Sequence, residues 1–189
     1  MPERWRAVIW LDRDGTVLDD PGYLNDPTNL VVLPGAATAI ARANAASVAV
    51  VMVTNQSGVG RGLFDLAALE RIHAEMRHQL AASAGARLDA IQICPHRPGE
   101  QCRCRKPRPG MVEQALLDPA LAGLPSAAIG DKSADVGLAH AVGALAILVR
   151  TGEGTQTERE LRESGTRIDH VADDLGGAID WFLGRLEVA

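Results

Sequence analysis

Two carboxylates, two residues apart, follow a short apolar run near the start of the chain. The run is Val8-Ile9-Trp10-Leu11, and the carboxylates are those of Asp12 and Asp14 in Asp12-Arg13-Asp14-Gly15-Thr16. An apolar run bounded by a Gly turn predicts a buried strand. Carboxylates at the end of such a strand can hold a hard cation, and one of them can attack an electrophile. For this segment alone a solvated turn is an equal alternative, because Asp and Gly are common turn residues.

Three further polar segments follow predicted strands. Thr54-Asn55-Gln56-Ser57-Gly58 offers hydroxyls and turn N–H groups that can hold phosphate oxygens, and Arg105-Lys106-Pro107 offers two cations that can neutralise phosphate charge. In Gly130-Asp131-Lys132, Asp131 can complete a magnesium site with Asp12 and Asp14. Asp135, one helical turn later, either supports this site or favours a helix start. Each segment is weak alone, but the four together are the groups that phosphoryl transfer needs.

Strand and helix patterns alternate along the chain, which predicts an α/β fold with a parallel sheet and helices on both faces. The strands are expected at Ala7–Leu11, Val48–Thr54, Ala90–Cys94, Ala127–Gly130 and Ala144–Val149, and the helices at Gly35–Ala46, Asp65–Ala84, Gly110–Leu117, Ser133–Val142 and Asp173–Leu186. Thr151–Gly165 is polar and predicts a loop with a short helix. Two connections, Val17–Val32 and Pro95–Pro109, are longer than a bare βαβ unit needs, and long loops of this kind usually carry function.

Length and composition predict a single soluble domain that covers residues 1–189. The chain is 47% hydrophobic and 23% charged, with a net charge of −5, which argues against nucleic acid or an anionic membrane as partner. The aromatic content is only 3%, so the interleaved aromatic surface of a nucleic-acid binder is also missing. The chain has no apolar run of the ~20 residues that span a bilayer and no signal-peptide pattern, so we expect a cytoplasmic protein.

A cluster of cysteines and one histidine predicts a zinc-binding loop at residues 94–104. The candidate ligands are Cys94, His96, Cys102 and Cys104, which form a Cys₃His set within eleven residues. Three buried thiols beside a surface histidine are the alternative, but buried thiols rarely cluster in a polar loop rich in Arg and Pro. A closed site of this kind is structural, and it would fix Arg105 and Lys106, which follow directly. The other histidines, including His73, are interpreted as ordinary helix or surface residues.

These segments resemble the haloacid dehalogenase superfamily, the phosphatases that use an aspartate nucleophile. All four motif positions match over nearly the whole length. Within the superfamily, Leu11–Thr16, Thr54–Gly58, Cys94-Pro95-His96, Cys102–Pro107 and Gly130-Asp131-Lys132 look like the branch that contains heptose-bisphosphate phosphatases and histidinol phosphatases. Pro21-Gly22-Tyr23 and Arg108–Met111 look more like the heptose enzymes. The resemblance implies a Rossmann-like three-layer α/β/α sandwich with a mostly parallel sheet and no large cap domain.

The resemblance also implies a role for each matching residue. Asp12 would be the nucleophile and Asp14 the general acid/base, while Thr54 and Lys106 would stabilise the transferring phosphoryl group. Magnesium would be held by Asp12, Asp131 and the main-chain carbonyl of Asp14. The implied substrate site is lined by Asp20, Gly22, Tyr23, Asn55, Gln56, Ser57, Arg105 and Lys132.

The resulting prediction is a monomeric, magnesium-dependent phosphatase with a structural zinc ion, acting on a small phosphorylated sugar at the C7 phosphate of heptose 1,7-bisphosphate. Histidinol phosphate or another small sugar phosphate is the alternative substrate. From other classes, a phosphoaspartate receiver would also use clustered Asp, Thr and Lys, but Asp14 favours turnover over storage of phosphate. A zinc-dependent binding module is the third alternative. Steady phosphate release with magnesium separates the enzyme from both.

Overall fold

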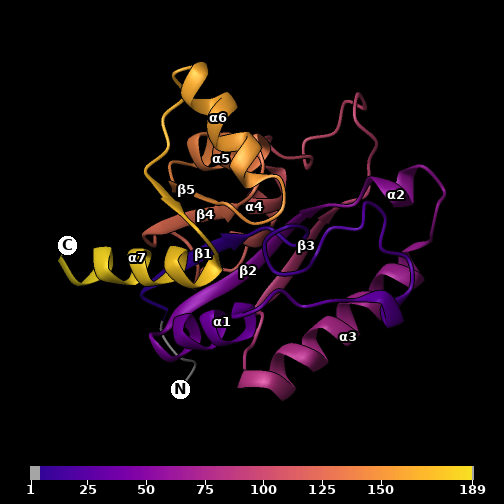
Figure 1. Cartoon of the computed structure of the whole chain (residues 1–189), viewed down its shortest axis with the longest axis horizontal. Coiled ribbons are helices and arrows are strands. Elements are labelled where there is room, and N and C mark those ends of the chain that lie inside the picture. Colours follow the sequence, from indigo (N-terminus) through magenta and orange to yellow (C-terminus); the bar gives the residue numbers. More distant parts are fainter. Residues whose placement is uncertain (1–4, 189) are drawn as a thin grey trace.

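A six-stranded sheet runs through the centre of the computed structural model, which describes residues 5–188 (Figure 1). Residues 1–4 and 189 of the predicted domain lie outside the described residues. The strand order is β3-β2-β1-β4-β5-β6 and every pair is parallel. The strands are β1 (Ala7–Leu11), β2 (Val48–Asn55), β3 (Ala90–Cys94), β4 (Ser126–Gly130), β5 (Leu145–Val149) and β6 (His170–Ala172).

Helices cover both faces of the sheet, so the predicted three-layer sandwich is confirmed. One layer holds α1 (Ala36–Ala45), α3 (Leu66–Ala84) and α7 (Leu175–Val188), and the other holds α4 (Gly110–Ala115), α5 (Ser133–Val142) and α6 (Gly154–Glu163) (Figure 1). Two short helices, η1 (Pro27–Asn29) and α2 (Ser57–Gly60), lie in connections. The connections at residues 12–35 and 95–109 hold η1, turns and isolated bridges, so neither builds a cap domain within residues 5–188.

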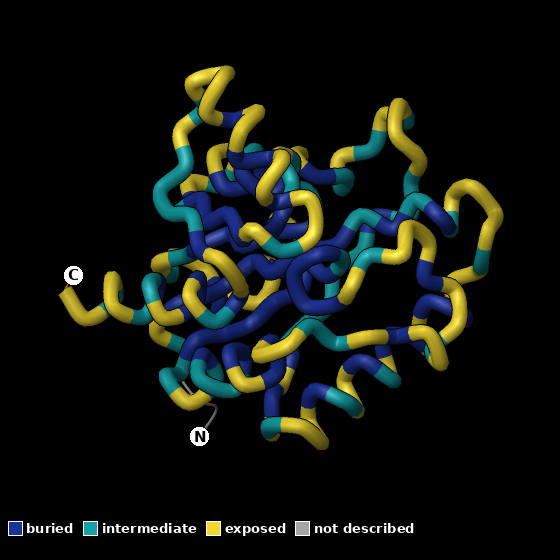
Figure 2. Tube along the Cα trace, in the orientation of Figure 1, coloured by how far each residue is buried: buried dark blue, intermediate teal, exposed yellow. Residues whose placement is uncertain are grey.

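Burial on both faces explains why the strands read as continuous apolar runs. In β1, Ile9 and Leu11 pack with residues of α1, α3 and α7, whereas Val8 and Trp10 pack with residues of α4 and α5. All five residues of β1 are buried, and Figure 2 shows the sheet as the buried centre of the molecule. A strand buried between two helical layers needs apolar side chains at every position.

The register of the strands brings the predicted functional segments to one edge of the sheet. Leu11 of β1 pairs with Met52 of β2 and with Ile129 of β4. Asp12 therefore leaves β1 near the ends of the flanking strands, where Thr54 is the second-last residue of β2 and Asp131 follows β4. The N–H of Asp12 donates to the carbonyl of Ile129 at 2.9 Å. Because β1 lies between β2 and β4, the chain reverses its direction of winding here, and such a switch point is where open α/β sheets bind ligands.

The short helices η1 and α2 lie outside the predictions, and the ends of α1, α3, α4, β2, β4 and β5 differ from the predicted ends by one or two residues. Three further differences have a physical reason. β6 was not predicted, because a three-residue edge strand gives almost no periodic signal. The expected loop at Thr151–Gly165 contains a ten-residue helix, α6, whose polar sequence is held by ion pairs from Glu158 to Arg150 and Arg162. The last helix begins two residues later than predicted, because the carboxylate of Asp174 caps it by accepting from the N–H of Gly177 at 2.9 Å.

Candidate active site

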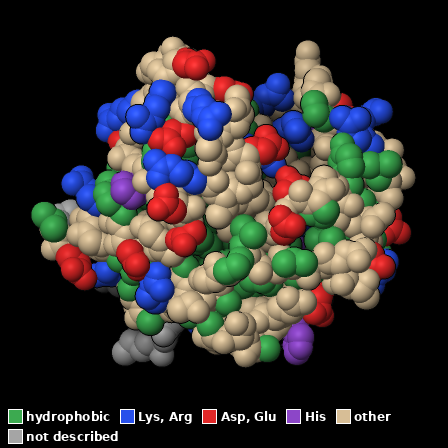
Figure 3. Space-filling view, viewed as in Figure 1, with side chains coloured by type: hydrophobic (Ala, Val, Ile, Leu, Met, Phe, Trp, Pro, Cys, Tyr) green, Lys and Arg blue, Asp and Glu red, His purple; other side chains and the backbone are tan. Residues whose placement is uncertain are grey.

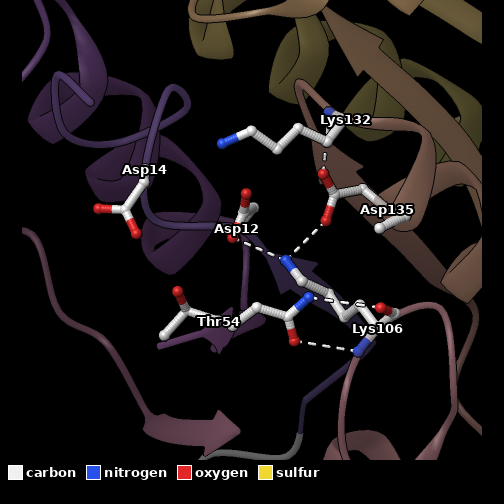
Figure 4. Close-up of a pocket in the computed structure, with 8 residues that line it drawn as sticks. Asp12, Asp14, Thr54, Lys106, Lys132 and Asp135 are labelled. Atoms are coloured by element: carbon white, nitrogen blue, oxygen red, sulfur yellow. Dashed lines mark hydrogen bonds and ion pairs between the residues drawn. The ribbon is translucent and has the colours of Figure 1, made fainter. Parts of the chain in front are cut away.

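A buried lysine joins two carboxylates at the centre of the site. The ammonium of Lys106 donates to Asp12 Oδ1 at 2.7 Å and to Asp135 Oδ1 at 2.6 Å, and Figure 4 shows both carboxylates converging on it. All three side chains are nearly inaccessible to solvent. The two carboxylates raise the pKa of Lys106 against the lowering effect of its burial, so the ammonium stays charged. A fixed cation is thereby placed directly beside Asp12.

Asp135 supports this arrangement from the start of α5. Its second oxygen, Oδ2, accepts from the N–H of Lys132 at 3.0 Å, so one carboxylate both caps the helix and anchors the Lys106 ammonium. The Asp135 carboxylate lies close to the main chain at Gly130, because the Cβ of any other residue at position 130 would lie 2.2 Å from Oδ2 of Asp135. Glycine at position 130 thus allows the carboxylate to reach across the end of β4, and the sequence alternatives for Asp135, a helix start and support of the site, both hold.

Asp131 sits fully buried at the end of β4 with one oxygen unsatisfied. Its Oδ2 accepts from the N–H of Glu153 at 2.8 Å, whereas Oδ1 has no hydrogen-bond partner among the described residues. Burial, and then the charge of Asp12, raise the pKa of Asp131 to about 7. The main chain at Gly15 lies close to the Asp131 carboxylate, because a Cβ at position 15 would lie 2.2 Å from Oδ2 of Asp131. Gly15 also has φ +82°, a conformation that favours glycine. A cation bound beside Asp131 would favour its ionised form.

Asp14 lies on the other side of Asp12, with its carboxylate turned away from Lys106 and Asp135 (Figure 4). Arg13 donates two hydrogen bonds to this carboxylate, from Nε to Oδ1 at 2.8 Å and from Nη2 to Oδ2 at 3.0 Å. Gln56 donates to Oδ2 at 2.8 Å. Burial raises the pKa of Asp14, and the Arg13 charge opposes that rise. A carboxyl whose pKa is raised toward neutrality is suited to give and take a proton.

Residues at the end of β2 are bound to their neighbours. The amide nitrogen of Gln56 donates to the hydroxyl of Thr54 at 2.8 Å, in addition to Asp14. Asn55 Oδ1 accepts from the N–H of Lys106 at 3.0 Å, so the segment after β2 holds the segment that carries the lysine. Gln56 and Asn55 therefore hold the site together, in addition to the substrate-lining role that the sequence resemblance implies for them.

A cavity of about 400 Å³ opens beside these groups. Its lining includes all eight residues of the implied substrate site, which are Asp20, Gly22, Tyr23, Asn55, Gln56, Ser57, Arg105 and Lys132, together with Asp14, Lys106 and Glu153. A smaller adjoining cavity is lined by Asp12, Asp14, Thr54, Lys106 and Asp135. The structure thus brings the implied nucleophile and the implied substrate residues together, although they come from separate segments that extend from Asp12 to Lys132.

Comparisons with known proteins agree on one family. A family model described as HAD-hydrolase-like matches residues 103–178. The D-glycero-β-D-manno-heptose-1,7-bisphosphate 7-phosphatase of Bordetella bronchiseptica is 43% identical over 181 residues, which is 93% of this chain and 97% of that protein. The D-glycero-α-D-manno-heptose-1,7-bisphosphate 7-phosphatase of Mycobacterium tuberculosis is 41% identical over 73% of this chain and 74% of that protein.

A crystal structure of the B. bronchiseptica D,D-heptose 1,7-bisphosphate phosphatase, complexed with magnesium and phosphate, superposes with a TM-score of 0.83. It is 39% identical in sequence and covers 95% of this chain and 99% of that chain. The chain belongs to the heptose-bisphosphate phosphatase family of HAD-like hydrolases. The resemblance predicted from the sequence motifs is therefore confirmed.

The acidic cluster of this family member fits a magnesium ion. Carboxylate oxygens of Asp12, Asp131 and Asp135 lie within 4.8 Å of one another and all three residues are buried. Asp135 already accepts through both oxygens, so the unpartnered Oδ1 of Asp131 and the carboxylate of Asp12 are the ligands that remain. Hard oxygen donors in small number are what Mg²⁺ prefers beside a phosphate.

The Cys₃His cluster fits a structural zinc ion. Cys94 Sγ lies 3.6 Å from His96 Nδ1 and 3.7 Å from Cys102 Sγ, and His96 Nδ1 lies 3.2 Å from Cys104 Sγ. Tetrahedral zinc with bonds of about 2.0–2.3 Å places its ligand atoms roughly 3.5–3.8 Å apart. The two separations from Cys94 lie in this range, and the separation between His96 and Cys104 is shorter. Burial raises the pKa of the Cys94 thiol, so a thiolate there requires a nearby cation. The guanidinium of Arg105 donates to the carbonyl of His96 at 3.3 Å, which ties this loop to the cavity.

Sequence reasoning missed two residues of the site. Arg13 is not among the candidate residues of the sequence analysis, yet its side chain is buried and binds Asp14. His73 was interpreted as an ordinary helix or surface residue, yet it is buried and its Nε2 lies 3.3 Å from Arg13 Nη1. The helical pattern of α3 places position 73 on the buried face, which was the available signal for a contact.

No helix within residues 5–188 is both long and apolar enough to cross a membrane. On the face shown in Figure 3, acidic and basic side chains are interspersed.

Proposed function

We propose that the protein hydrolyses the C7 phosphate of D-glycero-D-manno-heptose 1,7-bisphosphate through an aspartyl-phosphate on Asp12. The family to which the chain belongs and the carboxylate–lysine site support this activity. A separate feature of the cavity supports a substrate with two phosphates. This feature is the set of partners that each cation of the cavity has.

Three cations line the substrate cavity, and they differ in their partners. Lys106 is neutralised by Asp12 and Asp135, and Lys132 by Asp20 at 2.9 Å and Glu153 at 3.5 Å. Arg105 donates to a backbone carbonyl, and within residues 5–188 no carboxylate pairs with it. A guanidinium without a counter-ion at a phosphatase site is suited to bind a second phosphate, since the planar fork of Arg matches phosphate oxygens. This unpaired charge is the observation that carries the choice of a bisphosphate.

The reaction takes two displacements at phosphorus. In the first, a carboxylate oxygen of Asp12 forms a bond to the phosphorus, the bond to the C7 oxygen breaks, and the Asp14 carboxyl gives its proton to that leaving oxygen. In the second, Asp14 takes a proton from water, the water oxygen bonds to phosphorus, and the bond to Asp12 breaks, which releases phosphate. Lys106 and the Thr54 hydroxyl stabilise the transferring group in both steps. Bound magnesium supplies charge neutralisation of the phosphoryl oxygens in this site.

The test measures phosphate release from heptose 1,7-bisphosphate in the presence of Mg²⁺, for the wild type and for Asp12→Asn. We expect the wild type to turn over and Asp12→Asn to lose at least about 10³-fold in kcat, since the covalent route requires the carboxylate. Thermal unfolding of both proteins checks that the fold is kept. Wild-type rates in Asp12→Asn would refute the nucleophile, and turnover of histidinol phosphate alone would refute the substrate.

We also propose that the chain acts as a single-domain monomer in the cytoplasm, with residues 94–104 as its zinc-binding loop. The continuous sheet of residues 5–188 supports the single domain. Light scattering of the purified protein tests the oligomeric state, because a dimer would double the measured mass.

A further inference from the structure

Buried side chains connect Asp14, the implied acid/base, to helix α3. The connection runs through Arg13 to His73. Arg13 is 1% exposed, although it is a charged residue next to the reaction centre. Its Nε and Nη2 bind the two oxygens of Asp14, and Nη2 also donates to Gln56 Oε1 at 3.0 Å. The remaining terminal nitrogen, Nη1, lies 3.3 Å from Nε2 of His73 in α3.

The chemistry of this last contact fixes the state of the histidine. A guanidinium can only donate, so Nε2 of His73 must accept, and the imidazole is therefore neutral with its proton on Nδ1. His73 is 1% exposed. Burial, and then the charges of Arg13 and Arg77, lower the pKa of His73 to about 3. The acceptor is thus present throughout the pH range in which a phosphatase of this kind would work.

We propose that His73 is a positioning residue, which orients the Asp14 carboxyl for proton transfer by fixing the Arg13 guanidinium. The proposal rests on the proposed general acid/base role of Asp14. Asp14 lines the cavities of the site, whereas His73 would act only through Arg13.

The physical reason is the fork geometry of arginine. Buried N–H groups without an acceptor are costly, so a guanidinium that lost His73 would turn to find another partner for Nη1. Since the three nitrogens are held in one plane, that turn would pull Nε and Nη2 away from Asp14. Gln56 would follow, because it binds both Arg13 and Asp14. A displacement of the acid by about 1 Å is enough to cost roughly 10²-fold in rate.

The experiment compares leaving groups in matched variants. The wild type, His73→Leu, which removes the acceptor, and His73→Gln, which restores one at similar reach, are assayed with Mg²⁺ on a sugar phosphate and on p-nitrophenyl phosphate. The sugar oxygen needs a proton to leave, whereas the nitrophenolate does not. His78→Leu, an exposed position on the same helix, is the control for the helix, and Asp14→Asn is the reference for loss of the acid.

We expect His73→Leu to lose about tenfold or more in kcat/KM on the sugar phosphate and less than about threefold on the aryl phosphate, a smaller copy of the selective loss in Asp14→Asn. His73→Gln should recover most of the loss, and His78→Leu should match the wild type. Equal losses on both substrates, or no loss, in a folded His73→Leu would overturn the inference. If His73→Leu does not fold, His73→Asn, whose amide is too short to reach Nη1, takes its place with the same criteria. An Asp14→Asn variant without selective loss would instead refute the proposed role of Asp14.

Discussion

Arg105 shows how the partner of a side chain, more than its charge, decides its role. Arg105, Lys106 and Lys132 carry the same formal charge and line the same cavity. Lys106 is held between two buried carboxylates and is suited to the reacting phosphoryl group, while Lys132 bridges Asp20 and Glu153 at the rim. Only for Arg105, among these three and within the described chain, is the partner a carbonyl without formal charge. A second anion on the substrate therefore gains most from Arg105.

This difference predicts substrate preference. Charge-assisted bonds between a guanidinium and a phosphate are worth about 1.5–3 kcal/mol, so we expect the wild type to prefer heptose 1,7-bisphosphate over histidinol phosphate by at least roughly tenfold in kcat/KM. Arg105→Ala should remove most of this preference, and Arg105→Lys, which keeps the charge but not the fork, should retain part of it. The ratio of kcat/KM for the two substrates is the measurement. An unchanged ratio in Arg105→Ala would exclude Arg105 as the second-phosphate ligand.

Residue chemistry could be predicted from sequence where the residue itself ends a strand. Asp12, Asp14, Thr54 and Asp131 follow apolar runs directly, so their types and order predicted a site at one sheet edge. The arrangement inside that site could not be predicted in the same way. Whether Asp14 faces Lys106 or Arg13, and which histidine meets Arg13, depend on how α3 packs, and no local pattern encodes that.

At the scale of elements, the loop between β3 and α4 presents the cations. It runs from the buried thiol of Cys94 through Arg105 and Lys106 to Gly110. Such a polar segment buries little apolar surface, so a metal ion bound to its four Cys and His side chains would supply the order that packing does not. The same loop is tied to the site by Arg105 binding to His96 and by Asn55 binding to Lys106. Loss of the metal should therefore also disturb the position of Lys106, which we propose stabilises the transferring phosphoryl group.

We expect one tightly bound zinc ion per chain in the purified protein. Cys102→Ser removes one of four ligands and should lower the unfolding temperature by about 5 °C or more, roughly 2 kcal/mol for a domain of this size, together with kcat/KM. Arg103→Ala is the matched control, because Arg103 lies on the same loop with its side chain 84% exposed. Elemental analysis and thermal unfolding give the readouts. A fully active, zinc-free preparation would contradict this prediction, as would loss of zinc in Arg103→Ala.

The elements themselves were predictable in proportion to their length and burial. β1, β3 and α5 match their predicted bounds, because apolar strands carry strong local signals, as does a helix that begins after Lys132 and ends before Gly143. α6 was missed as a full helix because it is mostly polar, and its stability comes from an ion-pair network and from burial of Leu161. Tertiary contacts of this kind are set by the sheet that α6 covers, so they are invisible in a single window of sequence.

At the scale of the whole molecule, the fold concentrates negative charge where β1 and β4 end. Burial, and then the charge of Asp12, raise the pKa of Asp131 to about 7 and that of Asp135 to about 6. An acid with a raised pKa in the folded state binds more protons there than in the unfolded chain. Stability from these groups is therefore present below the ordinary Asp pKa of about 4 and falls as pH rises toward 7. Hydrogen bonds from Arg150 lower the pKa of Glu158, so the stability that this group contributes is lost as pH falls. The free energy of unfolding measured without Mg²⁺ therefore contains contributions with opposite pH dependence.

Binding of Mg²⁺ distinguishes the contribution of the buried aspartates of the site from that of Glu158. Mg²⁺ binds the ionised carboxylates of the site and leaves Glu158 untouched, so saturating Mg²⁺ should raise the unfolding temperature more at pH 7.5 than at pH 5.0. Because 1 kcal/mol shifts the unfolding temperature of a domain this size by about 2–4 °C, we expect the two Mg²⁺ shifts to differ by about 5 °C. Asp131→Asn keeps the fold's other ionisable groups and should abolish most of the difference. The unfolding temperatures are measured by differential scanning calorimetry. If Mg²⁺ raised the wild-type unfolding temperature equally at both pH values, the pKa values of Asp131 and Asp135 would not be raised in the folded protein as their burial implies.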